Sequence, residues 1–268
     1  MISKTMRIYG EWAESSIEVM KAFLKKGDTV VDIGANIGTV SIALADAVGE
    51  SGKVYAFECQ RKVFYNLCTN IMLNSCYNIF AIRALIGDTK GVLALDDEPS
   101  HLKSSSSINR GSISFVGFAE HMKIYNQVGI GFDKVSVNTL DEEIASLDSV
   151  KLIKIDVEGA EPAVLRGAVR TLKRNRPVIY LECGSEKLFR DVMPRLESAG
   201  YNCYWHAALH YRSDNYFNMP NMTGRKGDLN ILALPPNVLV GSDLIEKYNL
   251  KKCIGWSQVN EEFPGFQF

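Results

Sequence analysis

The sequence predicts a doubly wound α/β fold: a mostly parallel, seven-stranded sheet with helices on both faces and one inserted loop. Three observations lead to this prediction. Apolar, β-branched segments alternate with segments of helical periodicity, a glycine-rich turn joins the first strand to the next helix, and acidic residues directly follow several strands. Such alternation is typical of parallel sheets with right-handed crossover connections.

The expected elements follow one another along the chain. An amphipathic segment from Trp12 to Lys26 ends at Gly27, so residues 1–27 are predicted to form an N-terminal helical cap. The last two strands are joined by a long polar and aromatic connection over 207–228, so one of them is expected to be antiparallel. Strands are expected at 28–33, 53–58, 78–86, 134–138, 151–156, 177–183, 201–206 and 229–234, and helices at 38–48, 61–74, 139–147, from Glu161 onward, and at 186–199.

One polar stretch interrupts this alternation. Residues 96–134 contain Pro99, the run Ser104–Ser107 and several glycines. An insertion of this length in a compact domain is usually a binding loop or lid, and the alternative is a disordered surface excursion. We therefore expect one domain over 1–268 that carries an inserted loop.

Composition limits the classes of function. The 46% apolar content is sufficient for one core, and a net charge of −1 with a pI near 6.4 gives no electrostatic footprint for nucleic acid. Neither a signal peptide nor an apolar run long enough to span a bilayer is recognisable. The six cysteines are scattered without CxxC pairs, which favours a reduced, cytoplasmic compartment.

The most informative feature is the turn after the first strand. Gly34 and Gly38 allow positive φ angles, and the helix that follows offers free N–H groups. Glu58 ends the second strand about 20 residues later, where a carboxylate can accept both hydroxyls of a ribose. Asn36 disturbs the G-x-G-x-x-G spacing that a pyrophosphate requires, so S-adenosylmethionine fits better than a dinucleotide. The alternative is a turn that merely packs a helix on a strand.

Two further strands end in carboxylates. Asp156 and Glu182 interrupt apolar runs, and neighbouring parallel strands lie about 5 Å apart, so the two side chains are expected to converge. The pair could hold a divalent cation such as Mg²⁺, or supply a general base and its supporting acid. Lys154 lies on the same face and is expected either to pair with Asp156 or to reach the ligand. For Glu158 and Glu161, capping of the next helix is an equally good interpretation.

These motifs resemble a known family. Asp32–Gly38 and Ala56–Glu58 resemble the first two motifs of class I S-adenosylmethionine-dependent methyltransferases. The later runs resemble the signature of the FkbM-type group, and they are Asn138–Asp141, Leu152–Glu161 and Val164–Ala168. The similarity extends from about Tyr9 to Pro235, so the predicted fold is that of a class I methyltransferase.

The resemblance implies methyl transfer to a hydroxyl, commonly on a sugar or a polyketide-like natural product. It assigns Glu58 to the ribose, the segment around Ala84 to the adenine, and Tyr9–Trp12 to an element that closes over the site. The residues that it places around the rest of the cofactor are Asp32, Gly34, Ala35, Asn36, Gly38 and Asp156. Asn109 belongs to an N-x-G segment that this family carries in its inserted loop. Two departures are Cys59, which stands where the family usually has proline, and the length of the insertion.

The expected reaction is an SN2 displacement in which an acceptor oxygen attacks the methyl group. Asp156 and Glu182 are predicted to be a Mg²⁺ site or, without metal, Asp156 is the general base. His206 is a second candidate base, although packing in an aromatic strand explains it equally well. A sugar would suit the aromatic and amide side chains before the last strand, above all His210, Tyr211, Asn215 and Tyr216.

The expected partners are a small-molecule or glycan acceptor and a second copy of the chain, without nucleic acid. Two alternatives remain open at this point. One is a non-catalytic scaffold that binds the cofactor, and the other is an NAD-dependent oxidoreductase, for which Asn36 and the missing third glycine are unfavourable.

Overall fold

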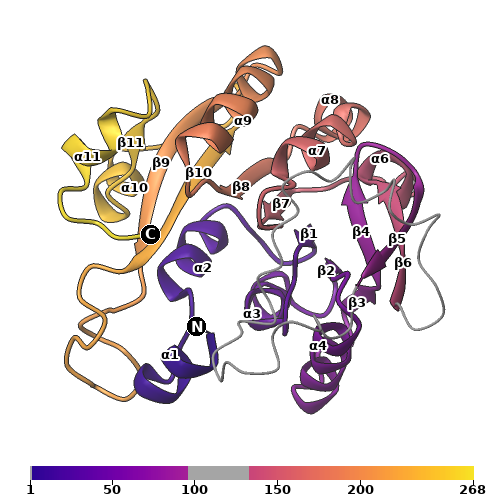
Figure 1. Cartoon of the computed structure of the whole chain (residues 1–268), viewed down its shortest axis with the longest axis horizontal. Helices are drawn as coiled ribbons and strands as arrows, with labels where there is room; N and C mark the ends of the chain where they lie inside the picture. Colours follow the sequence, from indigo (N-terminus) through magenta and orange to yellow (C-terminus); the bar gives the residue numbers. More distant parts are fainter. Residues whose placement is uncertain (1, 96–132) are drawn as a thin grey trace.

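The computed structural model describes residues 2–95 and 133–268. Among these residues the main sheet has eight strands (Figure 1). In spatial order they are β11 (Lys251–Lys252), β9 (Asn202–Leu209), β10 (Gly227–Leu234), β8 (Val178–Glu182), β7 (Leu152–Ile155), β1 (Thr29–Ile33), β2 (Lys53–Phe57) and β3 (Ile79–Ile82).

The directions of the strands confirm a mostly parallel sheet. Strands β8, β7, β1, β2 and β3 are parallel to one another, whereas β10 is antiparallel to both β8 and β9. One of the last two long strands is therefore antiparallel, as expected. The prediction of seven strands misses the edge strand β11, whose two residues are too short to produce a hydrophobic pattern.

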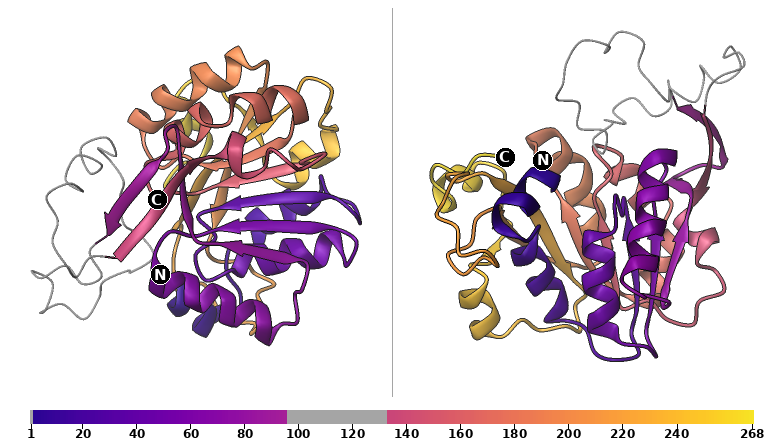
Figure 2. Two further views of the ribbon diagram at one scale, coloured as in Figure 1. Left: turned by 90° about the vertical axis from the view of Figure 1, so that its right-hand side faces the viewer. Right: turned by 90° about the horizontal axis from the view of Figure 1, so that it is seen from below.

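Helices cover both faces of the sheet (Figures 1 and 2). Alternate residues of β1 point to opposite faces of the sheet and pack in different hydrophobic cores. Val30 packs in the core that includes Leu44, and Val31 packs in the core that includes Val164 and Val192. The first core contains α2 (Glu14–Lys21), α3 (Thr39–Val48) and α4 (Arg61–Leu73), and the second contains α7 (Glu161–Arg166), α8 (Val169–Asn175) and α9 (Glu186–Ser198).

A second, three-stranded sheet corrects two expectations. It consists of β4 (Ala84–Gly87), β6 (Asp133–Thr139) and β5 (Gly91–Leu95). The single strand expected at 78–86 is two strands that belong to different sheets, and Arg83 between them forms an ion pair with Asp133. The strand expected at 134–138 is β6, which pairs here and not in the main sheet. The run around Arg83 is apolar on both sides, so the pattern gives no sign of this break.

The remaining elements lie at the ends of the chain and beside β6. The predicted cap contains α1 (Ile2–Tyr9) before α2, and the C-terminal segment contains α10 (Ser242–Lys247) and α11 (Gln258–Glu262). The helix expected at 139–147 is only α6 (Leu140–Glu143). The predicted insertion, with Asn109, lies outside the described residues except for 133–134. None of the described helices has both the length and the apolar character that a bilayer-spanning helix requires.

Candidate functional site at the carboxyl end of the strands

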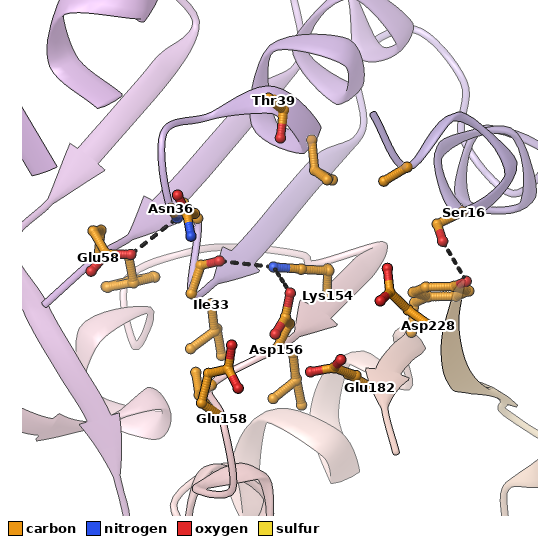
Figure 3. Close-up of a pocket in the computed structure, with 18 of the residues that line it drawn as sticks. Ser16, Ile33, Asn36, Thr39, Glu58, Lys154, Asp156, Glu158, Glu182 and Asp228 are labelled. Atoms are coloured by element: carbon orange, nitrogen blue, oxygen red, sulfur yellow. Dashed lines mark hydrogen bonds and ion pairs between the residues drawn. The ribbon is translucent and has the colours of Figure 1, made fainter. Parts of the chain in front are cut away.

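The register of the parallel strands brings the predicted site residues to one edge of the sheet. Ile33 is paired with Phe57 and with Ile155, and Ile155 is paired with Leu181. The residues that directly follow these positions are Gly34, Glu58, Asp156 and Glu182. All four line one cavity of about 320 Å³, which Figure 3 shows in close-up.

The turn after β1 requires glycine at its first position. Gly34 has a φ of +78°, and a Cβ placed there would lie 1.8 Å from the carbonyl oxygen of Asp156. Asn36 also has a positive φ, and its Oδ1 accepts a hydrogen bond of 2.8 Å from the Ile37 N–H. This conformation brings the backbone of Gly34, Ala35 and Asn36 to the wall of the cavity.

The Glu58 carboxylate is fixed by backbone donors. The N–H groups of Asn36 and Gln60 donate to its two oxygens over 3.0 and 2.8 Å. Burial raises the pKa of Glu58, and these hydrogen bonds lower it only in part. Each carboxylate oxygen has a further lone pair, so the group is fixed in place and still able to accept the hydroxyls of a ribose.

Lys154 links the turn at Gly34 to Asp156, the residue that follows β7. Its Nζ lies 3.2 Å from Asp32 Oδ1 and 3.2 Å from Asp156 Oδ2, and it donates to the Gly34 carbonyl over 2.8 Å. Burial lowers the pKa of Lys154, but the carboxylates of Asp156 and Asp32 raise it above its ordinary value overall. Of the two predicted roles, pairing with Asp156 is the one found. The lysine also lines the cavity.

Asp32 and Gly38 do not belong to the cavity lining, although both were predicted to contact the cofactor. The Asp32 side chain is completely buried and accepts a hydrogen bond of 2.5 Å from Ser41 Oγ. Gly38 begins α3 with a φ of +91°, and an added Cβ would lie 2.7 Å from Leu67 Cδ1. Both residues therefore flank the turn on the side away from the cavity. Ala84 does line the cavity, with Leu85 and Ile86.

Asp156 and Glu182 lie on neighbouring strands and face the same space, as expected (Figure 3). Burial raises the pKa of Glu182 well above its ordinary value, and the negative charges of Asp156 and Asp228 raise it further. A raised pKa favours the neutral form of Glu182, in which its carboxyl group can donate a hydrogen bond to Asp156.

The expected metal site receives no support. Within residues 2–95 and 133–268, no group of three or more histidine, cysteine or acidic side chains is arranged to hold a metal ion. The charge of Asp156 is balanced by Lys154, and the raised pKa of Glu182 disfavours a second negative charge beside it.

Trp12, which belongs to the predicted closing element, and Asn230 also line the cavity, and so do two residues that the sequence did not single out, Tyr180 and Asp228. Tyr180 lies two residues before Glu182 in β8, and Asp228 lies two residues before Asn230 in β10. Side chains two positions apart in a strand share a face, so this period could have identified both Tyr180 and Asp228. Asp228 is also held by His210, whose Nε2 lies 3.1 Å from its Oδ1.

His206 lies outside the cavity lining, which argues against its predicted role as a base. It is 2% exposed, and its Nδ1 lies 2.6 Å from the Tyr180 hydroxyl. Its Nε2 lies 3.2 Å from Ser15 Oγ. The Tyr180 hydroxyl donates to Ser16 Oγ over 2.9 Å, so His206 supports a lining tyrosine from within the core.

The predicted acceptor-binding side chains also lie elsewhere. His210 stacks on Trp12 and binds Asp228, and Tyr211 packs on Tyr9. Asn215 is buried and holds its own loop together through Arg212 and Met219, whereas Tyr216 is 77% exposed. None of these four lines the cavity. Their composition suits a sugar, but the long connection folds beside α1.

The burial of His206 predicts a loss of stability in acid. Burial lowers its pKa from 6.5 to about 4, so the unfolded chain binds the proton first as the pH falls. The stabilisation that comes from burying the neutral His206 ring is present in full above pH 6.5 and is lost as the pH falls toward 4. The unfolding free energy is expected to decrease by about 3 kcal/mol over this range. Urea unfolding of the wild type and of His206→Gln at both pH values measures it. A variant as acid-sensitive as the wild type would contradict the assignment.

The parallel sheet, the glycine turn and the acids at the strand ends define the class I methyltransferase fold. The chain matches the model of the methyltransferase FkbM domain over residues 32–203. The chain belongs to the FkbM methyltransferase family. No curated protein matches it.

One solved structure with a TM-score above 0.5 agrees with this fold. A methyltransferase FkbM from Methylobacillus flagellatus is similar over 83% of this chain and 48% of that one, with 16% identity and a TM-score of 0.53. This chain therefore corresponds to about half of that protein's length. A precorrin-6y C5,15-methyltransferase from Geobacter metallireducens has 15% identity and a TM-score of 0.46, with 82% and 86% of the two chains covered. Aeropyrum pernix fibrillarin, solved with bound S-adenosylmethionine, has 16% identity and a TM-score of 0.46, with 82% and 74% covered.

Proposed function

We propose that this chain is an S-adenosylmethionine-dependent O-methyltransferase that acts on a hydroxyl of a sugar, a glycan or a natural product. The observation that carries the proposal is a single cavity whose wall combines the Gly34 turn and Glu58 with the Asp156 and Glu182 carboxyl groups. The family supplies the reaction class, and the residues of the cavity supply the roles that follow.

The residues present fit the cofactor. Glu58 is positioned to accept the ribose hydroxyls, and Ala84, Leu85 and Ile86 offer an apolar wall for a purine. Lys154 is the only lysine or arginine among the described lining residues, against five carboxyl groups. A cavity with this charge suits a ligand that carries a sulfonium and an ammonium group.

The chain's own task is to align the acceptor and to remove its proton. S-adenosylmethionine, when bound, supplies an activated methyl group. The acceptor oxygen would take that methyl group, which would leave S-adenosylhomocysteine, and Asp156 would accept the proton of the acceptor hydroxyl. Lys154 holds Asp156 in place through an ion pair, and the neighbouring Glu182 carboxyl group lines the same cavity.

The acceptor is expected to contact the side of the cavity formed by Trp12, Tyr180, Asp228 and Asn230. Aromatic faces and polar groups together suit a polyhydroxylated molecule. Asp228 and Asn230 replace His210, Tyr211, Asn215 and Tyr216 as the residues that we expect to bind it.

The test is methyl transfer from labelled S-adenosylmethionine to a panel of sugars, glycans and hydroxylated natural products. Mass spectrometry of the product, followed by NMR, identifies the methylated atom. A product methylated on oxygen supports the proposal, and one methylated on nitrogen or carbon overturns it. Tight cofactor binding without turnover on any acceptor would favour the non-catalytic scaffold instead. A thermal shift with NAD and none with S-adenosylmethionine would favour the oxidoreductase.

Replacing Glu58 by glutamine tests the cofactor side. The amide cannot accept on its nitrogen and carries no charge, so we expect the Kd for S-adenosylmethionine to rise by roughly 10- to 100-fold. Isothermal titration calorimetry measures the change, with Glu186→Gln on the exposed side of α9 as the matched control. A Kd within twofold of the wild type would remove Glu58 from the binding site. Because burial raises the pKa of Glu58, affinity should also fall as acid protonates it.

Chelation tests the two roles predicted for the carboxyl pair. We expect the rate of methyl transfer to be unchanged after dialysis against EDTA, because Lys154 already balances the charge of Asp156. A rate that falls with EDTA and returns with Mg²⁺ would restore the metal site. Dialysis without chelator is the control.

A further inference from the structure

Exposed apolar side chains gather on α1 and on the loop between β9 and β10. They are Met6 at 37% exposed, Tyr216 at 77%, Phe217 at 51%, Met219 at 38% and Met222 at 62%. We call these five residues the α1–loop patch. Isolated apolar side chains are common on protein surfaces, but a contiguous group marks an interaction surface.

Hydrogen bonds between the two segments make the patch contiguous. The Phe217 N–H donates to the Tyr9 carbonyl over 3.1 Å, and the Met222 N–H donates to the Tyr9 hydroxyl over 2.8 Å. The Tyr216 N–H donates to Glu11 over 3.1 Å, and an added Cβ on Gly10 would touch the Tyr216 side chain. Figure 1 shows the loop folded alongside α1.

The loop is also braced from inside. The buried Asn215 side chain donates to the carbonyl groups of Arg212 and Met219 and accepts from the Met219 N–H. With its backbone fixed in this way, the loop presents Tyr216, Phe217 and Met222 to solvent. Their exposure is therefore built into the fold.

The two segments that carry these apolar side chains also carry positive charge. Lys4, Arg7, Arg225 and Lys226 are exposed on the same two segments, and no ion pair joins them to an acidic residue in the described part of the chain. The only acidic residue of the loop, Asp214, is paired with Arg212. Apolar side chains on segments that also carry unpaired cations complement an anionic bilayer, where the cations meet lipid headgroups and the apolar groups enter the interface.

We propose that the α1–loop patch docks the protein onto an anionic lipid surface. The patch adjoins the cavity, because Ile2 of α1 and Trp12 line it and Asp228 is the second residue of β10, which follows the loop. Docking therefore holds the acceptor side of the cavity near the headgroups. The inference concerns a surface outside the cavity, so it does not depend on the acceptor or on the reaction.

Sedimentation with vesicles tests the proposal on the full chain. We expect binding to phosphatidylcholine vesicles that contain phosphatidylglycerol, little binding to phosphatidylcholine alone, and loss of binding at ~1 M salt, where the Debye length is about 3 Å. Equal sedimentation with the two kinds of vesicle, or none with either, overturns the proposal. If the patch binds a protein partner instead, the chain should sediment with neither kind of vesicle.

Two double variants assign the binding to the patch. Phe217→Ser with Met222→Ser removes apolar contact, and Arg225→Glu with Lys226→Glu reverses charge, so each should lower the partition coefficient by roughly 10-fold or more. The matched controls are Tyr65→Ser with Met72→Ser on exposed positions of α4, and Lys173→Glu with Lys187→Glu on α8 and α9. Both controls should bind like the wild type.

Thermal unfolding checks that each variant is folded. If the apolar variant is unfolded, the charge-reversal variant is the one that tests the proposal. A folded patch variant that binds like the wild type overturns the proposal.

Discussion

Replacing Asp156 by asparagine is expected to lower kcat by about 10²- to 10⁴-fold, the usual contribution of a positioned general base. The amide has nearly the same shape but cannot take a proton from the acceptor hydroxyl. It also leaves Lys154 with Asp32 as its only carboxylate partner among the ion pairs of the described residues. Steady-state kinetics with a saturating acceptor measures the loss.

Cofactor affinity separates this effect from general damage. The Kd for S-adenosylmethionine should change by only a few-fold, because Glu58 and the Gly34 turn remain intact. Asp148→Asn makes the same chemical change at an exposed position outside the cavity and should leave kcat unaltered. If Asp156→Asn kept a wild-type kcat, Asp156 would not be the base, and the neighbouring Glu182 or Asp228 would be examined next.

Replacing Gly34 by alanine is expected to give the largest loss of stability. The added Cβ would lie 1.8 Å from the Asp156 carbonyl oxygen, and the backbone there has a φ of +78°. We expect the unfolding free energy to fall by about 3 kcal/mol or more, because a left-handed conformation and a steric clash with backbone are combined. For a chain of this size that is a fall in Tm of roughly 6–12 °C. Differential scanning calorimetry and cofactor titration measure both consequences.

Two other glycines divide this effect into its parts. Gly224 has a φ of +65° and no neighbour within 4 Å of an added Cβ, so Gly224→Ala reports the conformational cost alone. Gly184 has no neighbour within 4 Å and no positive φ, so Gly184→Ala reports the bare substitution. The order of destabilisation should be Gly34, then Gly224, then Gly184. A Gly34→Ala variant no less stable than Gly224→Ala would show that the close approach to Asp156 is not tight in solution.

The parallel half of the fold could be predicted from sequence because each signal there is local. The strand that ends at Ile33, the turn at Gly34 and the acid at Glu58 follow one another along the chain, and parallel pairing fixes their relative positions. Asp156 and Glu182 were paired correctly for the same reason. Their strands end at the same edge of the sheet, and adjacent strands bring the side chains together.

The acceptor side could not be predicted in the same way, because it depends on how a long connection folds. The polar and aromatic composition of 207–228 pointed to His210, Tyr211, Asn215 and Tyr216, but these side chains hold the loop and α1 together. The break at Arg83 was missed because the run is apolar on both sides, and only tertiary pairing decides where a strand changes sheet.

The antiparallel placement of β10 has a consequence for how this family could diversify. The parallel strands deliver the cofactor and base residues with their carboxyl ends, whereas β10 enters the same edge from its amino end, directly after the loop. Exchanging the segment 227–230 at the start of β10, which includes the lining residues Asp228 and Asn230, would therefore alter the acceptor side of the cavity and leave the Gly34 turn and Glu58 untouched. Exchange of this one segment is a modular route to new acceptor preferences.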